Sequence, residues 1–482
     1  MRKKLMCLLA AMTFAASYGA ENITTDVVVV GGGGAGLSAA IAAKEKGANV
    51  VLVEKMLMLG GNTNYATAGI NAANTKLQKK LGIEDSAELF YNDTMKGGKN
   101  VNNPELVKKL TTDSANIIDW LTERGADLSE VVFTGGQSAK RTHRPAGGQA
   151  VGPVIVDALA ETAEKDGIDV RTESEVTKLI KTGDKVTEST VKELLKEGDR
   201  VVGVKVEHKG KTYTIKAKAV VMATGGFGAN AKMVAEYKPS LEGFGSTNSP
   251  AITGEGIKMV KAVGGDLVDM TEIQTHPTVV HKKTAMITEA VRGEGAILVN
   301  REGKRFVSEL ETRDVVSKAE LEQTGKSAFL VFDQEVREKL GAINGYVRKG
   351  FTVEGATVEE LAKKIGVDVK GLVDTMAKYN GYVKAGEDKD FGKTALPREL
   401  VKAPFYAIEV SPAVHHTMGG VRINTNAEVL TADGKVIPGL FAAGEITGGV
   451  HGANRIGGNA VTDITVYGKT AGENRRRSFR YG

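Results

Sequence analysis

Residues 26–36 have the sequence Asp-Val-Val-Val-Val-Gly-Gly-Gly-Gly-Ala-Gly, and this stretch decides the fold. The apolar run that ends at Val30 is typical of a buried strand, and a helical pattern follows the glycines from about Leu37 to Lys46. A second apolar run, Asn49 to Glu54, completes a strand-helix-strand unit. The sequence therefore predicts an α/β protein of the Rossmann-like type, built on a parallel sheet.

The glycines have the spacing of a dinucleotide-binding turn. Gly31, Gly33 and Gly36 form Gly-x-Gly-x-x-Gly, which lets backbone amides approach a pyrophosphate at the N-terminus of the following helix. Glu54, at the end of the second strand, can accept a hydrogen bond from a ribose hydroxyl. A glycine turn with a purely structural role is the alternative, but strand, helix and acid all stand where dinucleotide binding requires them.

Runs of small residues farther along the chain favour FAD over NAD as the dinucleotide. Residues 60–63 (Gly-Gly-Asn-Thr) and 66–69 (Ala-Thr-Ala-Gly) suit a long, extended cofactor. The apolar run 219–223 leads into Thr-Gly-Gly, and Gly-Leu-Phe-Ala-Ala-Gly-Glu ends at residue 445. We assign cofactor binding to Gly31, Gly33, Gly34, Ala35, Gly36, Glu54, Lys55, Gly61, Asn62, Thr63, Ala68, Gly69, Thr224, Gly225, His416, Gly444, Glu445, Asn459 and Ala460.

The composition describes a globular protein with more than one domain. The chain of 482 residues is about three times as long as a typical ~150-residue domain. Hydrophobic residues make up 41%, charged residues 26%, and there are only 10 prolines, which excludes a disordered or collagen-like chain. We predict a nucleotide domain formed by residues 21–270 and 405–482, interrupted by a mixed region of strands and helices at 271–404.

The N-terminus has the three-part layout of a secretory signal peptide over residues 1–20. Basic residues 2–4 precede the apolar run 5–16 and a small-residue segment. The apolar run is shorter than the ~20 residues that span a bilayer, and no later run reaches that length. A retained N-terminal helix is the alternative. The only cysteine, Cys7, lies in this segment, so we expect no disulfide, no thiolate metal site and no Cys-x-x-Cys-His haem attachment in the mature chain.

The charge balance argues against nucleic acid as a partner. The net charge is +5, and removal of the three basic residues in the signal segment leaves about +2. We find no basic stripe of the size that nucleic-acid binding needs. The arginines of residues 475–480 form a solvated tail or, as the alternative, a docking site for an acidic partner.

The remaining segments give structural predictions. Residues 75–130 have helical patterns, and Asn103-Pro104-Glu105 is a typical helix start. Residues 184–199 have the composition of a surface insertion, and residues 384–393 that of a charged surface loop. We assign no chemistry to any of them.

Four histidines stand in tight motifs: His276, His415, His416 and His451. We expect a site role for the first two, with a structural role as the alternative, and both roles stay open for His451. His143 is also ambiguous. No spacing of ligands suits a metal ion, so we predict no metal site.

Three arginines complement the histidines: Arg292, Arg313 and Arg455. Guanidinium groups bind carboxylates through two parallel hydrogen bonds, and they prefer anionic ligands. A lone arginine is more often part of a surface ion pair, so spacing alone leaves their role open.

The most specific runs are His276-Pro277-Thr278, residues 288–293 (Thr-Glu-Ala-Val-Arg-Gly), residues 299–306 (Val-Asn-Arg-Glu-Gly-Lys-Arg-Phe), residues 415–420 (His-His-Thr-Met-Gly-Gly) and residues 451–459 (His-Gly-Ala-Asn-Arg-Ile-Gly-Gly-Asn). The chain resembles the flavin-containing part of periplasmic flavocytochrome c fumarate reductases, within the fumarate reductase and succinate dehydrogenase flavoprotein family. The resemblance covers essentially the whole mature chain. It implies non-covalent FAD in a Rossmann-like domain, which is interrupted by a smaller α+β capping domain that closes over it.

The resemblance also implies roles for individual residues. Arg455 and His415 would hold one carboxylate of an unsaturated dicarboxylate. The other carboxylate would lie among His276, Thr288 and Glu289. Arg313 would donate the proton, supplied through Glu289 and Arg292, while His416 would lie against the flavin and Met286 near the olefin.

The implied reaction turns fumarate into succinate in the periplasm. A hydride passes from N5 of the reduced flavin to one olefinic carbon, and the proton of Arg313 goes to the other. Cationic donors lower the barrier where negative charge develops. Many members of the family carry an N-terminal multihaem domain, which the present sequence lacks. The resemblance therefore implies a separate periplasmic cytochrome c as the electron donor.

Two alternatives to fumarate reduction stay open. Residues 132–136 (Val-Phe-Thr-Gly-Gly) lack a methionine that the resemblance leads us to expect before the glycine pair. Another enoate, of the urocanate, methacrylate or cinnamate type, is therefore the alternative substrate, although His276 and Glu289 favour a dicarboxylate. An alternative of another class is a non-catalytic electron-transfer flavoprotein, which would need no arginine as proton donor.

Overall fold

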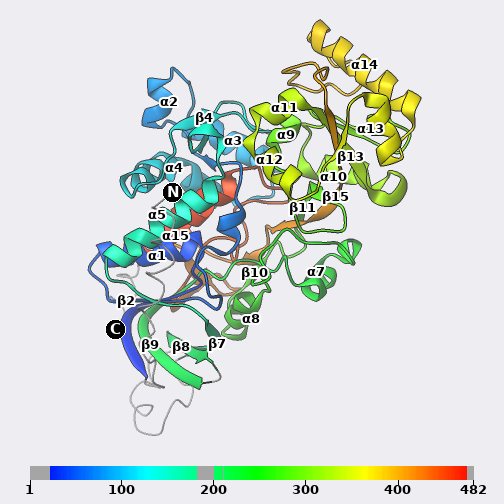
Figure 1. The fold of residues 1–482 in the computed structure, drawn as a ribbon. Coiled ribbons are helices and arrows are strands. Elements are labelled where there is room, and N and C mark those ends of the chain that lie inside the picture. Colours follow the sequence, from blue (N-terminus) through cyan, green and yellow to red (C-terminus); the bar gives the residue numbers. More distant parts are fainter. Residues whose placement is uncertain (1–21, 182–199, 210, 475–482) are drawn as a thin grey trace, which may run out of the picture.

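The glycine-rich stretch joins a strand and a helix at the centre of the larger sheet (Figure 1). Strand β1 (Ile23–Val30) pairs in parallel with β2 (Val50–Val53), and helix α1 (Gly34–Glu45) connects them. The valines of β1 at positions 27–30 are at most 4% exposed, as expected for a parallel strand covered on both faces. The helix begins at Gly34, earlier than the predicted Leu37, because the turn closes on itself: a Cβ on Gly36 would lie 1.8 Å from the Gly31 carbonyl oxygen.

The computed structural model describes residues 22–181, 200–209 and 211–474. The predicted signal peptide, the predicted insertion at 184–199 and the arginines at 475–480 lie outside the described residues.

The larger sheet has eight strands. Six of them have the order β17-β18-β9-β1-β2-β6, β8 pairs with β9, and β7 pairs with β8. The strands not yet given are β6 (Asp169–Arg171), β7 (Ser174–Lys181), β8 (Val201–His208), β9 (Lys211–Met222), β17 (Glu428–Leu430) and β18 (Val436–Ala442). β1 pairs in parallel with β9, and β9 in parallel with β18. Segments from both ends of the chain therefore meet in one sheet, as the Rossmann-like prediction requires.

Helices α1, α5 (Val151–Lys165) and α15 (Asn459–Asn474) pack side by side, and α1 lies on the central strands (Figure 1). Glycines on α15 permit this close packing, because a Cβ on Gly468 or Gly472 would lie within 2.5 Å of an α1 carbonyl oxygen. Helix α4 (Pro104–Glu123) packs against α15 and begins where predicted, with the Asn103 side chain accepting from the Glu105 amide at 3.0 Å. The predicted helix-rich character of residues 75–130 is confirmed.

The other elements of the first unit are short. They are α2 (Lys76–Lys80), α3 (Ala87–Gly97), α7 (Ala231–Tyr237), α8 (Glu255–Ala262), β10 (Leu267–Val268), β16 (Gly420–Val421), the 3₁₀ turns η2 (Gly61–Tyr65), η3 (Ala146–Gly148) and η4 (Pro239–Leu241), and a three-stranded sheet of β3 (Ile70–Asn71), β5 (Thr142–Arg144) and β4 (Glu130–Val132).

A second unit surrounds a separate five-stranded sheet, at the upper right of Figure 1. Its strands are β11 (Ile273–Val280), β12 (Ile297–Val299), β13 (Ala328–Asp333), β14 (Val353–Gly355) and β15 (Phe405–Thr417). Its helices are α9 (Ala290–Gly293), α10 (Arg313–Leu321), α11 (Gln334–Lys339), α12 (Gly341–Arg348), α13 (Val358–Ile365) and α14 (Val369–Ala385), with the turn η5 (Thr324–Lys326). The strands of this sheet pair in antiparallel orientation, which is typical of an α+β unit.

The buried apolar side chains form two separate clusters, one for each unit. The clusters change between Ile273 and Val280 and again between Val410 and Val414, within strands β11 and β15. The predicted fold class, a Rossmann-like domain interrupted by a smaller α+β domain, is confirmed. The boundaries at 271 and 404 stay a prediction, and we propose that the apolar clusters mark the division.

The prediction of a charged surface loop at 384–393 is wrong for two of its residues. Asp388 and Lys393 are only 5% and 3% exposed. Asp388 accepts from Arg305 at 2.8 Å, and Lys393 donates to the Ala296 carbonyl at 2.9 Å and lies 3.4 Å from Glu309. Alternating charges resemble a solvated loop in the sequence, but opposite charges from distant segments pair with them and allow their burial.

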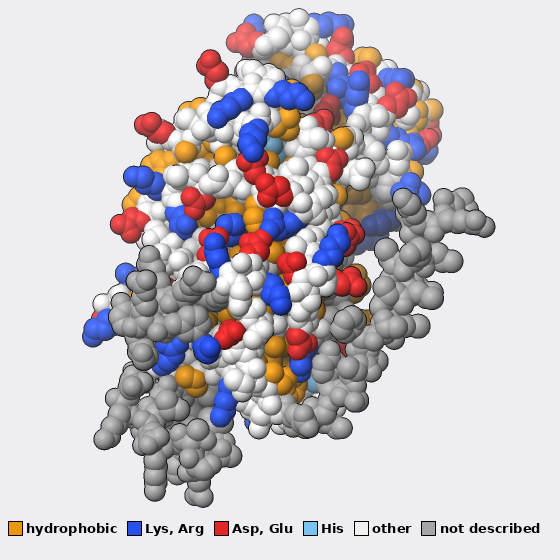
Figure 2. All heavy atoms as spheres, turned by 90° about the vertical axis from the view of Figure 1, so that its left-hand side faces the viewer, with side chains coloured by type: hydrophobic (Ala, Val, Ile, Leu, Met, Phe, Trp, Pro, Cys, Tyr) orange, Lys and Arg blue, Asp and Glu red, His pale blue; other side chains and the backbone are white. Residues whose placement is uncertain are grey.

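The surface agrees with the nearly balanced charge. On the face shown in Figure 2, lysine and arginine side chains are interspersed with aspartate and glutamate. None of the helices within the described residues is long and apolar enough to cross a bilayer.

Candidate active site

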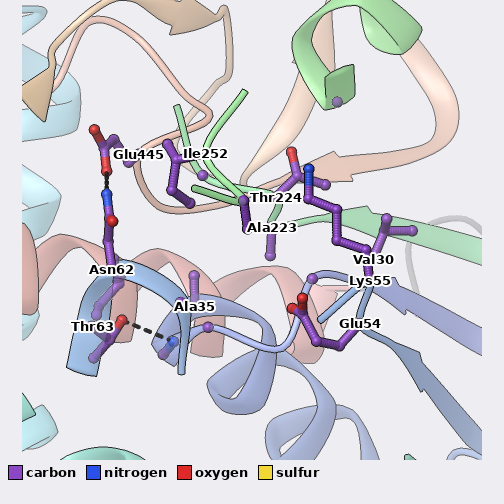
Figure 3. Close-up of a pocket in the computed structure, with 18 of the residues that line it drawn as sticks. Val30, Ala35, Glu54, Lys55, Asn62, Thr63, Ala223, Thr224, Ile252 and Glu445 are labelled. Atoms are coloured by element: carbon purple, nitrogen blue, oxygen red, sulfur yellow. Dashed lines mark hydrogen bonds between the residues drawn. The ribbon is translucent and has the colours of Figure 1, made fainter. Parts of the chain in front are cut away.

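The glycine turn forms one wall of a cavity of about 850 Å³, a volume that includes the open space at its mouth (Figure 3). Seven stretches of the chain line it. The lining residues are Val30, Gly31, Gly33, Gly34, Ala35, Val53, Glu54, Lys55, Gly61, Asn62, Thr63, Ala223, Thr224, Gly225, Ala251, Ile252, Glu255, Gly256, Met259, Ala443, Glu445 and Ile464.

The geometry of this nucleotide pocket fits a dinucleotide. Gly31 has φ +106°, and a Cβ there would lie 2.4 Å from the Ala223 carbonyl oxygen, so only glycine suits the turn. Helix α1 begins at the pocket wall without a side-chain cap at Gly33. The Gly34 amide donates to Thr63 Oγ1 at 3.1 Å, so a phosphate would bind the other amides of the first turn. Glu54 is 8% exposed and is fixed by the Gly32 and Met56 amides, at 2.7 and 2.8 Å. Its carboxylate retains lone pairs for a ribose hydroxyl.

Twelve of the nineteen predicted cofactor residues line this pocket. The other seven are Gly36, Ala68, Gly69, His416, Gly444, Asn459 and Ala460. Gly36, Gly69 and Gly444 instead allow close packing of backbone against neighbouring segments. Asn459 accepts from Asn71 at 2.6 Å and donates to Thr94 at 3.1 Å, which fixes the start of α15. Ala68 and Ala460 are half-buried.

The prediction missed the apolar lining of the pocket. Ile252, Met259 and Ile464 come from segments with no cofactor motif. Their role follows from the folding of distant segments onto β1 and α1, and no local pattern distinguishes them from ordinary core residues.

A second group of polar residues, which we call the Glu289 cluster, consists of Gln274, Glu289, Arg292, Arg313 and Arg455. Arg313 Nε donates to Glu289 Oε1 at 2.6 Å, and Arg292 Nη2 lies 3.4 Å from the same oxygen. Arg292, Arg313 and Arg455 are 3%, 8% and 6% exposed. The structure therefore brings together all three arginines that the sequence analysis singled out: Arg313 and Arg292 lie at Glu289, and Arg455 joins them through Gln274.

Gln274 holds the cluster together and was missed by the sequence analysis. Its Oε1 accepts from Arg313 Nη1 at 2.9 Å and from Arg455 Nη2 at 3.2 Å. Its Nε2 donates to Asn454 Oδ1 and to the Arg455 carbonyl, at 2.6 and 2.9 Å. Its place two residues before His276 in β11 was the one available signal, because alternate residues of a strand share a face.

Two predicted histidines border the cluster. The rings of His276 and His415 are 5.2 Å apart in an edge-to-face arrangement, and His276 Nε2 lies 3.8 Å from Glu289. Thr247 Oγ1 is hydrogen-bonded to His415 Nδ1 at 2.7 Å, which fixes that ring. Thr247 was not predicted.

The other two predicted substrate residues lie on the segment before α9. The Thr288 amide donates to the Tyr346 hydroxyl at 3.1 Å, and the Thr67 and Thr288 hydroxyls are 3.5 Å apart. Met286 is half-buried, and its backbone is bridged to Val279. Thr288 therefore connects the second unit to the chain beside the nucleotide pocket.

Burial and the arginines determine the protonation of the cluster. Burial alone would raise the pKa of Glu289, but Arg313 and Arg292 outweigh it and hold this pKa well below the usual range. Burial, helped by Arg313, lowers the pKa of Arg455 to about 9. Burial and Arg313 also lower the pKa values of His276 and His415 well below their ordinary value, so both rings are neutral at pH 7.

Glu445 and His416 lie between the pocket and the cluster, because His416 is the strand partner of Gln274 where β15 pairs with β11. Asn62 Nδ2 donates to Glu445 Oε2 at 3.1 Å (Figure 3), and His416 Nδ1 lies 3.5 Å from Glu445 Oε1. The ring of His416 is 5.4 Å from that of His451, whose Nε2 lies 3.2 Å from Asp463. His416 is therefore positioned between the nucleotide pocket and the buried His451–Asp463 pair.

His143 lies outside both sites. It is 0% exposed, and its ring nitrogens bond to Thr75 Oγ1 and the Arg141 carbonyl, both at 2.9 Å. A structural role explains all of its contacts. Among the described residues, no group of three or more His, Cys, Asp or Glu side chains is arranged to hold a metal ion.

Known proteins agree with this arrangement. The family model for the FAD binding domain matches residues 26–461. The chain is 51% identical to a fumarate reductase (cytochrome) of Shewanella frigidimarina over 459 residues, 95% of this chain and 78% of the relative. It is 38% identical to a urocanate reductase of Eggerthella lenta, over 95% of this chain and 76% of the relative. The solved open conformation of a flavocytochrome c3 fumarate reductase superposes with a TM-score of 0.80 at 43% identity, covering 99% of this chain and 81% of that one. The chain therefore belongs to the FAD-binding flavoprotein family of the flavocytochrome c fumarate reductases.

Proposed function

We propose that this protein is an FAD-dependent fumarate reductase that converts fumarate to succinate. One observation carries the proposal: Arg313 forms an ion pair with Glu289 in a buried cluster of three arginines, and Glu445 connects the nucleotide pocket to His416, the strand partner of Gln274 in that cluster. An electron-transfer flavoprotein without a substrate has no need of such a cluster.

The charge of the cluster suits a dianionic substrate. The cluster contains three arginines and one carboxylate, and the neighbouring histidines are neutral, so positive charge is in excess. Burial also raises the pKa of Glu445, which favours its uncharged form. We propose that Arg455 and His415 hold one carboxylate, and that His276, Thr288 and Glu289 surround the other. Met286 would line the space at the olefin.

We propose that the nucleotide pocket holds FAD without a covalent bond. Bound and reduced, FAD would supply the hydride. The backbone of the glycine turn and the N-terminus of α1 would bind the pyrophosphate, and Glu54 the ribose. His416 would lie against the flavin.

We propose that Arg313 gives the proton to the second olefinic carbon. Its Nε already donates to Glu289 at 2.6 Å, so a proton can return to the guanidinium along an existing hydrogen bond. Arg292 is 3.4 Å from the same carboxylate, and burial lowers the pKa of Arg292 against the opposing effect of Glu289. A lowered pKa makes a guanidinium a better proton donor.

Another enoate is the second candidate substrate. A urocanate reductase is among the relatives, and no methionine precedes Gly135-Gly136. The Gly135 backbone lies near the cluster, because a Cβ there would be 3.7 Å from the Leu310 carbonyl oxygen, three residues before Arg313. His276 and Glu289 favour a second carboxylate.

We propose that electrons come from a separate c-type cytochrome in the periplasm, reached through the predicted signal peptide. A c-type haem attachment needs two cysteines, and the sequence has only Cys7. A relative with 51% identity is a fumarate reductase (cytochrome), which supports a haem donor.

The test is a substrate panel with the purified, FAD-loaded protein and a reduced low-potential dye. Oxidation of the dye is followed with fumarate, urocanate, methacrylate and cinnamate. We expect the highest kcat/KM with fumarate. Turnover with another enoate and none with fumarate would replace the proposed substrate, and bound FAD with no turnover on any of the four would indicate the electron-transfer alternative.

A further inference from the structure

Glu320 is a buried carboxyl group that the proposed reaction does not use. It lies near the C-terminal end of α10, and it is 0% exposed. Among the described residues no hydrogen bond of ordinary geometry reaches either of its oxygens, although the Ala328 amide lies near enough to favour the charged form. An unpaired, buried carboxylate is costly, and such a group takes up a proton instead. Burial raises the pKa of Glu320 well above the ordinary value, against the opposing effect of Arg292.

The buried face of α10 connects Glu320 with the proton donor. Arg313, Ser317 and Glu320 are spaced four and three residues apart, so they share one face, and all three are buried. The seven residues from Arg313 to Glu320 span about 10 Å of helix. The Ser317 hydroxyl between them has no partner within the part of the chain that the structure describes. Directly after Glu320, residues 322 and 324–326 are exposed, so Glu320 stands between the surface and Arg313.

Arg292 links Glu320 to the Glu289 cluster. Its Nη1 donates to the Glu309 carbonyl at 2.7 Å, and its Nη2 lies 3.4 Å from Glu289. Its Nε, in contrast, has no acceptor among the described residues. Arg292 and Glu320 form no ion pair within 4.0 Å, but each affects the pKa of the other, so Arg292 lies within electrostatic range of a carboxyl group of the cluster and of one outside it.

The elements packed against α10 offer Glu320 no other charged partner. They are β11, β15 and the turn η5. Their titratable side chains, with that of the residue between α10 and η5, are His276, Glu322, Lys326, Tyr406, Glu409, His415 and His416. Glu409 already accepts from Arg301 and Ser327, at 2.6 and 2.9 Å. Arg292 is the one charged side chain that changes the pKa of Glu320.

We propose that Glu320 is a positioning residue. It holds the next proton and supplies it to the relay through Arg292, Glu289 and Arg313. The inference rests on the proposed function and extends its proton path towards the surface at the end of α10. In one turnover Arg313 gives its proton to carbon. The ionised Glu289 takes a proton from Arg292 and passes it to Arg313, so Glu289 ends the step ionised again. Arg292 then takes the proton of Glu320, and solvent restores the neutral acid, so each group loses and regains one proton.

The test uses the full-length, FAD-loaded protein and three variants. Glu320→Gln keeps the shape of the side chain and removes the acid, and Glu320→Asp keeps the acid. Glu322→Gln is the control, because this glutamate is exposed at the same end of α10. Fumarate reduction is measured from acid to alkaline pH in H₂O and D₂O, and infrared difference spectra record the C=O stretch of protonated carboxyl groups.

We expect Glu320→Gln to lower kcat about tenfold, less than the ~10²–10⁴-fold typical of a direct proton donor, because internal water can replace part of the relay. KM should hardly change, the solvent isotope effect on kcat should rise, and one protonated-carboxyl band should vanish. Glu320→Asp should restore part of the rate, and Glu322→Gln should match the parent.

Three results would overturn the relay. If the parent reduces fumarate and Glu320→Gln shows the same pH profile and isotope effect, Glu320 carries no proton and the proposed function stands. If the parent has bound FAD and no fumarate turnover, the proposed function fails and the relay fails with it. Loss of FAD absorbance in Glu320→Gln with normal absorbance in Glu320→Asp would also overturn it, since that pattern indicates a structural role.

Discussion

The nucleotide pocket and the Glu289 cluster are neighbours, but they are built from different materials. Backbone and small side chains form the pocket wall around Gly31, and the space that missing Cβ atoms leave is its main feature. The cluster consists of charged side chains that hold one another in place, with Gln274 between Arg313 and Arg455. The pocket therefore depends on shape, whereas the cluster depends on charge.

This difference predicts how each region fails. A substitution that adds atoms to the pocket wall should prevent cofactor binding, whatever its charge. In the cluster, a substitution that keeps the volume and removes a charge or a hydrogen bond should stop the chemistry and leave the cofactor in place. Variants that affect one region and spare the other therefore test the comparison.

The largest effect is expected from Arg313→Ala. It removes the proposed proton donor and should lower kcat about a thousandfold or more. General acid catalysis contributes ~10²–10⁴-fold, and the variant also loses the ion pair with Glu289. FAD absorbance should stay normal, because Arg313 does not line the nucleotide pocket. The control is Arg337→Ala, an arginine whose partners are Tyr406 and Asn344. Turnover that survives in Arg313→Ala would refute the proton-donor role.

The next effect is expected from Gly31→Ala. Its positive φ costs about 1–2 kcal/mol for a residue with a Cβ, and the Cβ would also meet the Ala223 carbonyl oxygen at 2.4 Å. Gly47→Ala is a matched control, since Gly47 has φ +81° and open space around it. We expect FAD affinity to fall at least about tenfold in Gly31→Ala only, in line with ~1.4 kcal/mol for each factor of ten. Equal affinities in the two variants, by fluorescence titration of the apoprotein, would show that the clash is unimportant.

The pocket could be predicted from the sequence because its central features are local. Gly31, Gly33 and Gly36 lie within one turn, and the strand and helix around them are fixed by patterns of a few residues. The start of α4 at Asn103 was equally accessible. The early start of α1 at Gly34 could not be predicted, because it depends on the close approach of Gly36 to the Gly31 carbonyl.

The cluster could be predicted only in part. Its arginines and histidines are rare, strongly polar residues in recognisable runs, so the sequence and the resemblance indicated them. Gln274 has no such signal, since its role arises from contacts with residues 39 and 181 positions away. Burial of Asp388 and Lys393 was unpredictable for the same reason, because their partners Arg305 and Glu309 lie about eighty residues earlier.

A smaller effect is expected from substitutions of Gln274. Gln274→Leu removes the acceptor shared by two arginines and should lower kcat about tenfold, which corresponds to ~1.4 kcal/mol. Gln274→Glu keeps an acceptor for both arginines and adds a negative charge beside the substrate site. It should therefore raise KM more than it lowers kcat. If both variants have the kinetics of the parent, Gln274 does not position Arg313.

The smallest effect concerns stability in acid. It contrasts His143, which lies outside both sites, with Glu289 in the cluster. Burial lowers the pKa of His143 to about 4, whereas the unfolded chain has the ordinary value of ~6.5. Between these values the unfolded state binds more protons, so the free energy of unfolding should fall by up to about 3 kcal/mol as the pH falls from 6.5 to 4. The stabilisation by Glu289 depends on pH in the same direction but in a lower range: its pKa is depressed, so its contribution is complete above ~4.5 and is lost only in stronger acid. Urea unfolding at a series of pH values gives the free energy of unfolding as a function of pH. Between pH 6.5 and 4 this free energy should fall less steeply in His143→Gln than in the parent. If the two proteins show the same pH dependence, His143 takes up its proton without unfolding. That result would contradict the role inferred from its full burial and from the two hydrogen bonds of its neutral ring.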